Sequence, residues 1–167
     1  MIFKVKRHNS DLYNILLFLS RNIIFYNKIR LPDKFETRLY LMFIHFSIMM
    51  IIHKKKGRKF DQKIYDNFFH NIENNLRELG FGDVSVNKKM KDFNKILYDV
   101  LLKVEQINEQ DRKFKISQKL VLKYFPELGD VKSGKFLLFE TYFLNFYHFC
   151  FEQSLDNMVR EAINFKN

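Results

Sequence analysis

Residues 60–93, FDQKIYDNFFHNIENNLRELGFGDVSVNKKMKDF, decide the fold class of this chain. In the first part, apolar residues recur at steps of four, four, four, four and three, which is the spacing of one α-helical face. These residues are Phe60, Ile64, Phe68, Ile72, Leu76 and Leu79. Gly80 follows directly, where a helix commonly ends in a left-handed residue. Apolar spacing then resumes, so we expect a second helix to begin after Ser85 or Asn87. Its buried face should carry Val86, Met90, Phe93, Leu97, Val100 and Val104.

Helical spacing also covers the N-terminal part of the chain. A first helix is expected to begin at Ser10 or Asp11, because either side chain can cap it. Its apolar face would carry Leu12, Leu16, Leu19 and Ile23. Pro32 marks a break, after which Asp33 is the expected cap of a helix that runs to about Lys55.

The C-terminal part adds two further helices. A short one should end where Pro126 stops it, and a long aromatic one should begin near Asp130 or Ser133 and reach Phe165. Alternating strand patterns are missing from the sequence. We therefore predict an all-α, single-domain bundle of about six helices over the whole chain, with the helices of residues 108–165 completing it.

Composition agrees with a helical globule and suggests an anionic partner. Hydrophobic residues make up 47% of the 167 positions, and 20 of them are phenylalanine, whereas there are only two prolines and five glycines. The net charge of +10 predicts attraction to phospholipid headgroups, RNA or acidic proteins, although a coding bias toward A and T would also enrich lysine. Cys150 is the single cysteine, which excludes an intramolecular disulfide and suggests a reducing compartment.

The most apolar run, LYLMFIHFSIMMII over residues 39–52, has 14 residues. A spanning helix needs about 20, so the run is expected to form a core helix, or a face that touches a bilayer without crossing it. The basic start of the chain is followed by Ser10 and Asp11, which is not typical of a signal peptide.

The spacing of the histidines, carboxylates and cysteine bears on whether the chain binds a metal or acts as an enzyme. Asp66, His70 and Glu73 lie one helical turn apart, but a metal-binding bundle would need a matching set on another helix, and the sequence offers none. His148 and Cys150 point roughly 200° apart on a helix, which does not suit a nucleophile pair. We expect no catalytic residues, no metal, no cofactor and no small-molecule substrate.

His45 interrupts the apolar run, and Arg38 lies two turns before it on the same face. Two interpretations are open. His45 is a hydrogen-bonded core residue beside an ion-paired arginine, or both residues make polar contacts in a binding groove.

Lysines open the helix that follows Gly80. Lys88 and Lys89 oppose the helix dipole, which suggests that an anionic partner approaches them. The alternative is that neighbouring acids, Glu78, Asp83 and Asp92, already neutralise them.

Two segments resemble the ubiquinol-cytochrome c chaperone family. They are LPDKFETRLYLMFIHF, residues 31–46, and YDNFFHNIENNLRELGFGDVSVNKKMK, residues 65–91. The first carries the resemblance through Leu31, Pro32, Asp33, Phe35, Glu36, Arg38 and His45. The second carries it through Tyr65, Asp66, Phe68, Phe69, Leu76, Arg77, Glu78, Gly80, Gly82, Asp83, Val86, Lys88, Lys89 and Lys91. The likeness covers about residues 12–105, and the chain departs from the family pattern at Lys34, Thr37, Asn71 and Asn87.

The resemblance implies a non-catalytic assembly factor of the cytochrome bc1 complex, of the kind found in mitochondria and α-proteobacteria. Its client would be newly made cytochrome b, and a small helical partner and the ribosome are further possible contacts. The implied location is the cytoplasmic face of a bacterial inner membrane, or the matrix side in a eukaryote. The candidate partner-binding residues are Arg38, His45, Arg77, Phe81, Asp83, Lys88 and Lys89, with Gly80 and Gly82 as a structural junction.

Two alternatives come from other classes. The basic charge also suits an RNA-binding, ribosome-binding or membrane-surface adaptor protein. A haem protein or enzyme would use His45, His70 or His148.

Overall fold

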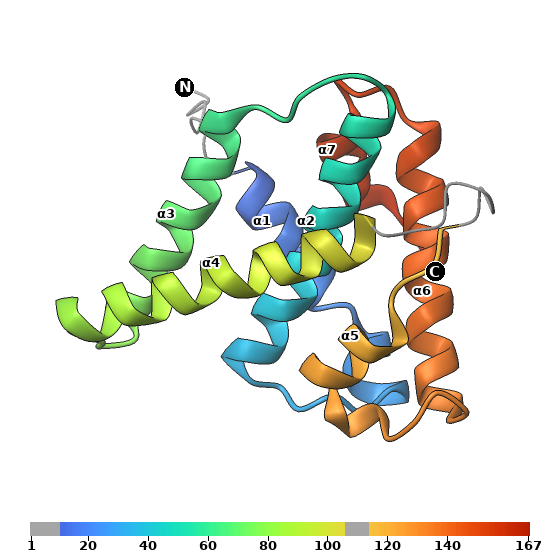
Figure 1. The fold of residues 1–167 in the computed structure, drawn as a ribbon, viewed down its shortest axis with the longest axis horizontal. Helices are drawn as coiled ribbons and strands as arrows, with labels where there is room; N and C mark the ends of the chain where they lie inside the picture. The colour runs from blue at the N-terminus through green and yellow to red at the C-terminus, as the bar shows by residue number, and fades with distance from the viewer. Residues whose placement is uncertain (1–10, 106–113) are drawn as a thin grey trace, which may run out of the picture.

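The computed structural model describes residues 11–105 and 114–167, and every regular element in these two ranges is helical (Figure 1). The α-helices are α1 (Asp11–Ser20), α2 (Phe35–Lys55), α3 (Gln62–Glu78), α4 (Asp83–Glu105), α5 (Gln118–Tyr124), α6 (Gly134–Glu152) and α7 (Met158–Glu161). A π-helical turn, η1 (Ile24–Lys28), and two 3₁₀ turns, η2 (Pro126–Leu128) and η3 (Ala162–Asn164), connect them. The predicted all-α fold is confirmed, with seven α-helices in the described ranges rather than about six.

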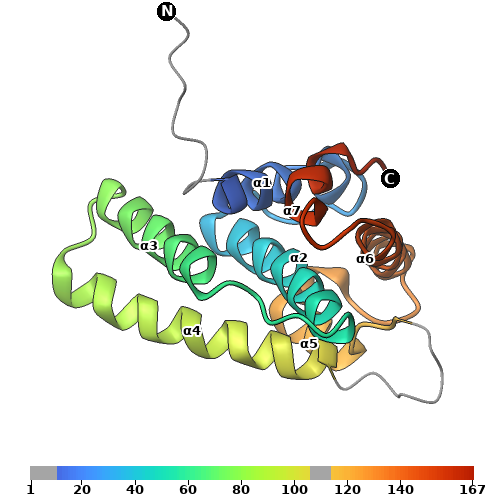
Figure 2. The same ribbon diagram turned by 90° about the horizontal axis from the view of Figure 1, so that it is seen from above.

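Helix α2 is the centre of the molecule. Figure 2 shows it between α1 and α7 on one side and α4 on the other, with α6 beside its second half. Helix α3 contacts both α1 and α4 and lies at one end of the molecule. The buried residues of these helices form one continuous core.

By length and composition α2 could cross a membrane, but 72% of its most apolar 18-residue window is buried inside the domain. A helix that is apolar all round must be covered on all sides, and here other helices cover it. This burial favours the core-helix interpretation of residues 39–52.

The second half of α2 is tied to α6 by aromatic and basic residues. Phe143 of α6 packs against Phe25 of η1 and His45 of α2, with ring centroids 5.9 and 4.8 Å apart. Lys55 Nζ donates to Tyr147 Oη at 3.0 Å. Lys56 Nζ donates to the carbonyls of Phe151, in the last turn of α6, and of Gln153, directly after it. Lys55 and Lys56 therefore stabilise the packing of α2 against α6.

Most of the predicted core face is confirmed. Phe68, Ile72 and Leu76 are at most 1% exposed, but Leu79 is 57% exposed because α3 ends one residue before it. Ile23 is also exposed, because α1 stops at Ser20 and the chain turns into η1.

Three predicted helix ends are wrong. Asp33 does not cap α2: Lys34 is the N-cap without a side-chain bond, and Asp33 pairs with Arg38 instead. Helix α4 begins at Asp83, before Ser85. Helix α6 is capped by Ser133 as expected but ends at Glu152, short of Phe165.

The break after Glu152 involves no proline or glycine. The Gln153 backbone is extended, and α7 follows as a separate helix. A cap at Ser10 and most of the polar segment 105–115 lie outside the described residues.

Candidate functional site

The corner between α3 and α4 is a regular helix-ending motif. Gly80 has φ +95°, its N–H bonds the Arg77 carbonyl at 3.0 Å, and the Phe81 N–H bonds the Leu76 carbonyl at 3.2 Å. This pair of bonds is the Schellman motif, which requires a left-handed residue where Gly80 stands. Gly82 differs, because its φ is not positive; its carbonyl accepts from the Val86 N–H at 2.9 Å. Helix α4 therefore starts immediately after the turn.

Arg77 fastens the corner from outside. Its guanidinium donates to Glu73 one turn back at 3.0 Å and to Asp83 at the start of α4. The hydrogen bond to Asp83, and to a smaller extent the one to Glu73, raises the pKa of Arg77. Asp83 is thus engaged by an arginine of α3 and does not neutralise Lys88 or Lys89.

Apolar side chains face solvent at this corner. Leu79, Phe81 and Val84 are 57%, 39% and 85% exposed. Lys89 places Nζ 4.8 Å from the Phe81 ring centroid, a cation–π distance, while Lys88 points into solvent. Three large apolar residues in six positions form an unusual surface for a helix junction, and we name Leu79, Phe81 and Val84 the corner patch.

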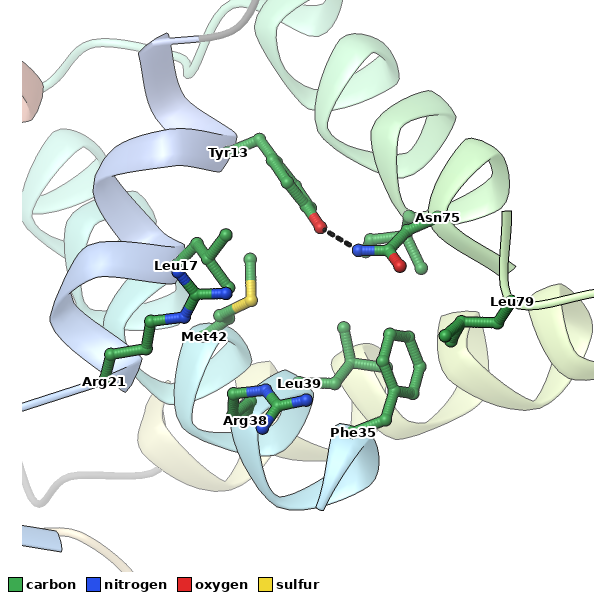
Figure 3. A pocket seen from close by; sticks show the side chains of 10 residues that line it. Tyr13, Leu17, Arg21, Phe35, Arg38, Leu39, Met42, Asn75 and Leu79 are labelled. Atoms are coloured by element: carbon green, nitrogen blue, oxygen red, sulfur yellow. Dashed lines mark hydrogen bonds between the residues drawn. The ribbon is translucent and has the colours of Figure 1, made fainter. Parts of the chain in front are cut away.

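A groove of about 180 Å³ lies beside the corner patch, between α1, the start of α2 and the end of α3 (Figure 3). Leu79 belongs to both features. The other lining residues are Tyr13, Leu17, Arg21, Phe35, Arg38, Leu39, Met42, Ile72 and Asn75. Asn75 donates to Tyr13 Oη at 2.7 Å and bridges α3 to α1. The result is a mainly apolar hollow with arginines beside it.

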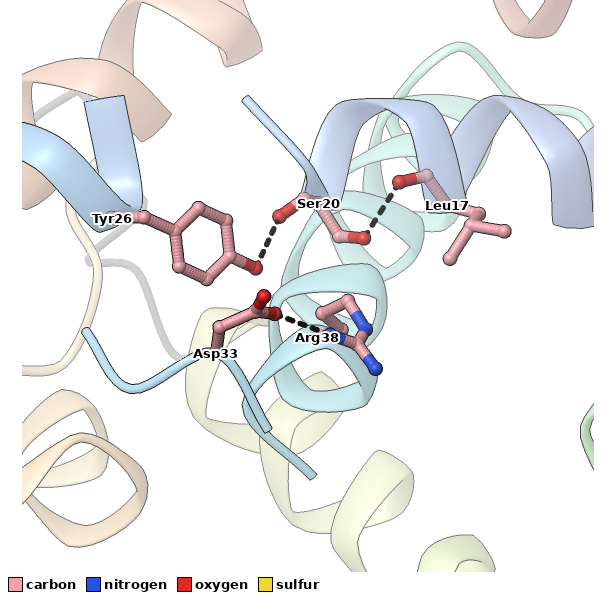
Figure 4. A network of polar contacts seen from close by, with 5 residues as sticks. All are labelled: Leu17, Ser20, Tyr26, Asp33 and Arg38. Atoms are coloured by element: carbon pink, nitrogen blue, oxygen red, sulfur yellow. Dashed lines mark hydrogen bonds and ion pairs between the residues drawn. The ribbon is translucent and has the colours of Figure 1, made fainter. Parts of the chain in front are cut away.

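The two arginines differ in their surroundings. Arg38 forms an ion pair with Asp33 (Figure 4). Beside this pair, Tyr26 Oη donates to the Ser20 carbonyl at 2.7 Å, and this hydrogen bond holds η1 against the end of α1. Burial raises the pKa of Tyr26, so it remains a donor. Arg21 is exposed and has no ion pair among residues 11–105 and 114–167. The groove therefore has one cation that is engaged and one that is available to an anionic group.

His45 lies in the core and not in the groove. It is 0% exposed; Nδ1 is 2.6 Å from the Leu41 carbonyl and Nε2 is 2.9 Å from Tyr142 Oη. Burial lowers its pKa to about 3, so the ring is neutral at physiological pH. With Nδ1–H donating to Leu41, Nε2 accepts from Tyr142. Of the two sequence interpretations, the structure supports the hydrogen-bonded core histidine.

The other titratable candidates do not assemble. Asp66, His70 and His148 are exposed, and the described part of the chain has no group of three His, Cys, Asp or Glu that could hold a metal. Cys150 is fully buried, and burial raises its thiol pKa to about 12, so it is protonated and unreactive.

Of the predicted site residues, the groove contains Arg38, and Leu79 of the same groove lies next to the corner that Arg77, Phe81 and Asp83 form in the chain. Sequence reasoning missed the contribution of α1, which is Tyr13, Leu17 and Arg21. A signal was present: α1 also has apolar residues at Leu17 and Phe18, which widen its apolar arc beyond the buried face. That excess does not by itself say which helix α1 adjoins.

The groove and the corner patch are two accessible apolar features of this all-α protein. A family model described as Ubiquinol-cytochrome C chaperone matches residues 27–127, from η1 through α5. The match covers more than half of the chain, which therefore belongs to this family, as the resemblance predicted. Searches of curated proteins and of solved structures found no match. The matched region includes the corner patch and the α2 and α3 walls of the groove, whereas α1 and α6 lie outside it.

Proposed function

We propose that this protein is a non-enzymatic assembly chaperone of the cytochrome bc1 complex that binds newly made cytochrome b. Family membership supports the bc1 assembly role. The observation that supports a binding mode is the groove between α1, α2 and α3, which adjoins the corner patch.

The size of the groove argues for a protein client. Small-molecule pockets commonly hold about 300–1,000 Å³, whereas this hollow holds about 180 Å³ and is open to solvent. One large apolar side chain of a client would fit it. Leu17, Phe35 and Leu39 would cover that side chain, and Arg21 would attract a neighbouring carboxylate.

The corner supplies the remaining proposed contacts. The proposed contacts are Phe81 of the corner patch and four charged residues near it in the chain, Arg77, Asp83, Lys88 and Lys89. A small helical partner or the ribosome would meet the same edge. We place the protein in the cytoplasm, peripheral at the inner membrane, or on the matrix side in a eukaryote.

The client role is tested with a double variant, Arg21→Glu with Leu79→Glu, in a strain that lacks the native gene. Both side chains are exposed enough to change without disturbing the core. We expect reduced cross-linking to cytochrome b and reduced bc1 content. The matched control is Lys132→Glu with Leu137→Glu, an exposed cation and an exposed leucine near the start of α6.

The outcomes separate the role from the site. A deletion strain with normal bc1 content and normal ubiquinol oxidation contradicts the chaperone role. If the deletion lowers bc1 content and the groove variant restores it as fully as the control does, the role stands and the groove is not the site.

Ribosome binding is the second candidate, and the net charge of +10 is the observation that favours it. Phosphate contacts release counterions, so co-sedimentation with ribosomes should fall steeply as salt rises. Absence from ribosomes at low salt contradicts this candidate.

A further inference from the structure

The outward face of α4 carries a stripe of six exposed residues, of which Val84 also belongs to the corner patch and Lys88 to the proposed client contacts, whereas the other four have no part in the client role. The six residues are Val84, Lys88, Lys91, Lys95, Tyr98 and Leu102, which we name the α4 stripe. At 100° per residue these positions fall within an arc of about 80°, so they point in one direction. All six are exposed, and the opposite face of the helix is buried through Val86, Phe93 and Leu97.

The stripe has a distinctive order along the helix axis. Three lysines occupy its middle, Val84 stands at one end, and Tyr98 and Leu102 stand at the other. The three apolar residues are 85%, 57% and 58% exposed. From Val84 to Leu102 the stripe extends about 27 Å at 1.5 Å per residue. Figure 2 shows α4 along one edge of the molecule, with α2 behind it and no described element outside it.

The charge of the stripe is not neutralised locally. The adjacent Asp99 accepts from Lys123 Nζ at 2.8 Å and Tyr124 Oη at 2.6 Å on α5, and these bonds lower its pKa. Asp92 is the remaining acid on that flank, and asparagines 87 and 94 stand on the other. Lys88, Lys91 and Lys95 make no ion pair among residues 11–105 and 114–167.

We propose that the α4 stripe is the surface by which this protein docks on an anionic phospholipid bilayer. A straight row of cations with apolar residues at both ends matches a planar surface in which phosphates lie above hydrocarbon. Tyrosine suits the interface, since its ring is apolar and its hydroxyl is polar. Helix α2, whose composition would span a membrane, stays in the core. This docking does not depend on the proposed client role.

RNA fits the stripe less well than a bilayer does. Single-stranded RNA is held by aromatic rings on which bases stack, whereas the stripe offers one tyrosine and two aliphatic residues. The nearest phenylalanine, Phe81, has Lys89 over its ring. The exposed Val84 and Leu102 have no evident use against a phosphate backbone.

The test is co-sedimentation of the full chain with vesicles of phosphatidylglycerol and phosphatidylcholine in equal parts, compared with phosphatidylcholine alone. The charge variant changes Lys88, Lys91 and Lys95 to Gln. Each lysine near an anionic surface is worth roughly fivefold in partitioning, so we expect a loss of roughly a hundredfold. The matched control changes Lys28, Lys132 and Lys166 to Gln, three exposed lysines outside α4, and should lose far less.

A second variant, Val84→Ser with Leu102→Ser, leaves the charge unchanged. We expect it to weaken vesicle binding several-fold, which a purely electrostatic contact would not show. Circular dichroism melts of all variants verify that the fold is retained.

Three outcomes overturn the proposal. One is wild-type binding that does not prefer phosphatidylglycerol, and another is a control variant that loses as much binding as the α4 variant. The third is retention on polyuridylate, but not on vesicles, that depends on the three α4 lysines; this result would assign the stripe to RNA. None of these outcomes bears on bc1 content in the deletion strain, so the client role is judged separately.

Discussion

Two lysine-rich segments of this chain look alike in the sequence and have opposite surroundings in the fold. At the C-terminal end of α2, Lys55 and Lys56 bond to Tyr147 and to carbonyls at the end of α6. On α4, Lys88, Lys91 and Lys95 extend from a face that no described element covers. Lys55 and Lys56 stabilise the packing of α2 against α6, whereas the three α4 lysines remain exposed. Net charge alone therefore overstates the binding surface.

His45 and Arg21 illustrate the same division. His45, in the α2–α6 core, has both ring nitrogens engaged, and its partner Tyr142 lies 97 positions away in the chain. Arg21, beside the groove, has no ion pair in the described part of the chain. The polar ring of His45 is therefore satisfied inside the core, whereas the guanidinium of Arg21 stays accessible beside the groove.

The largest expected effect is a loss of stability at low pH that is caused by His45. Its pKa is lowered to about 3 in the fold by burial, while an unfolded histidine titrates near 6.5. Between these values the unfolded chain binds the extra proton, so the stability that the neutral ring contributes is present above pH 6.5 and is lost as pH falls. Between pH 6.5 and pH 5 the free energy of unfolding should fall by about 2 kcal/mol from this residue.

Urea unfolding at several pH values measures this loss. The control is His70→Gln, since His70 is exposed on α3, and its replacement should leave the pH dependence in place. If an NMR titration of the folded protein shows that the neutral His45 ring becomes positively charged between pH 6.5 and pH 5, the prediction is wrong.

The next largest effect on stability is expected at the corner between α3 and α4, where Gly80 must adopt a left-handed backbone conformation. Gly80→Val should cost about 1–2 kcal/mol, because a β-branched residue is strained at φ +95° even though no atom lies within 4 Å of the new Cβ. Gly82→Ser is the control: its φ is not positive, and serine is favoured at a helix start, so stability should hold or rise slightly. Equal melting temperatures for the Gly80→Val variant and the parent would contradict the left-handed cap.

The smallest effect compares the two lysine segments directly. Lys56→Gln removes bonds of 2.6 and 2.8 Å to the Phe151 and Gln153 carbonyls and should cost about 1 kcal/mol. Lys88→Gln should change stability by no more than about 0.5 kcal/mol, because its side chain is exposed and its charge opposes the helix dipole. If chemical denaturation shows equal losses for both variants, the division between structural and accessible lysines is wrong.

The sequence predicted local structure well where the cause is local. The period of α3 and α4, the left-handed Gly80 and the cap at Ser133 each depend on residues within one or two turns, and all are confirmed. The predicted cap of α2 failed because a second side chain, five residues along the chain, competed for it. Asp33 could have capped α2, but Arg38 takes its carboxylate.

The site could be predicted only in part. The corner residues were found because a family pattern and a glycine turn fall in one continuous stretch. The wall that α1 contributes was missed, since Leu17 and Arg21 are distant in sequence from Leu79 and meet it only through the packing of α1 and α3 around α2.

By itself, then, the sequence determined that the chain is helical, which faces are apolar, where Gly80 turns the backbone, and which family the pattern resembles. These properties follow from side-chain periodicity and backbone sterics over short distances. Only the tertiary structure decided that His45 is buried and neutral, that Lys55 and Lys56 belong to the fold, and that Arg21 and the α4 lysines remain accessible. A polar group is satisfied or available according to what lies within about 3 Å of it, and those neighbours come from helices far apart in the chain.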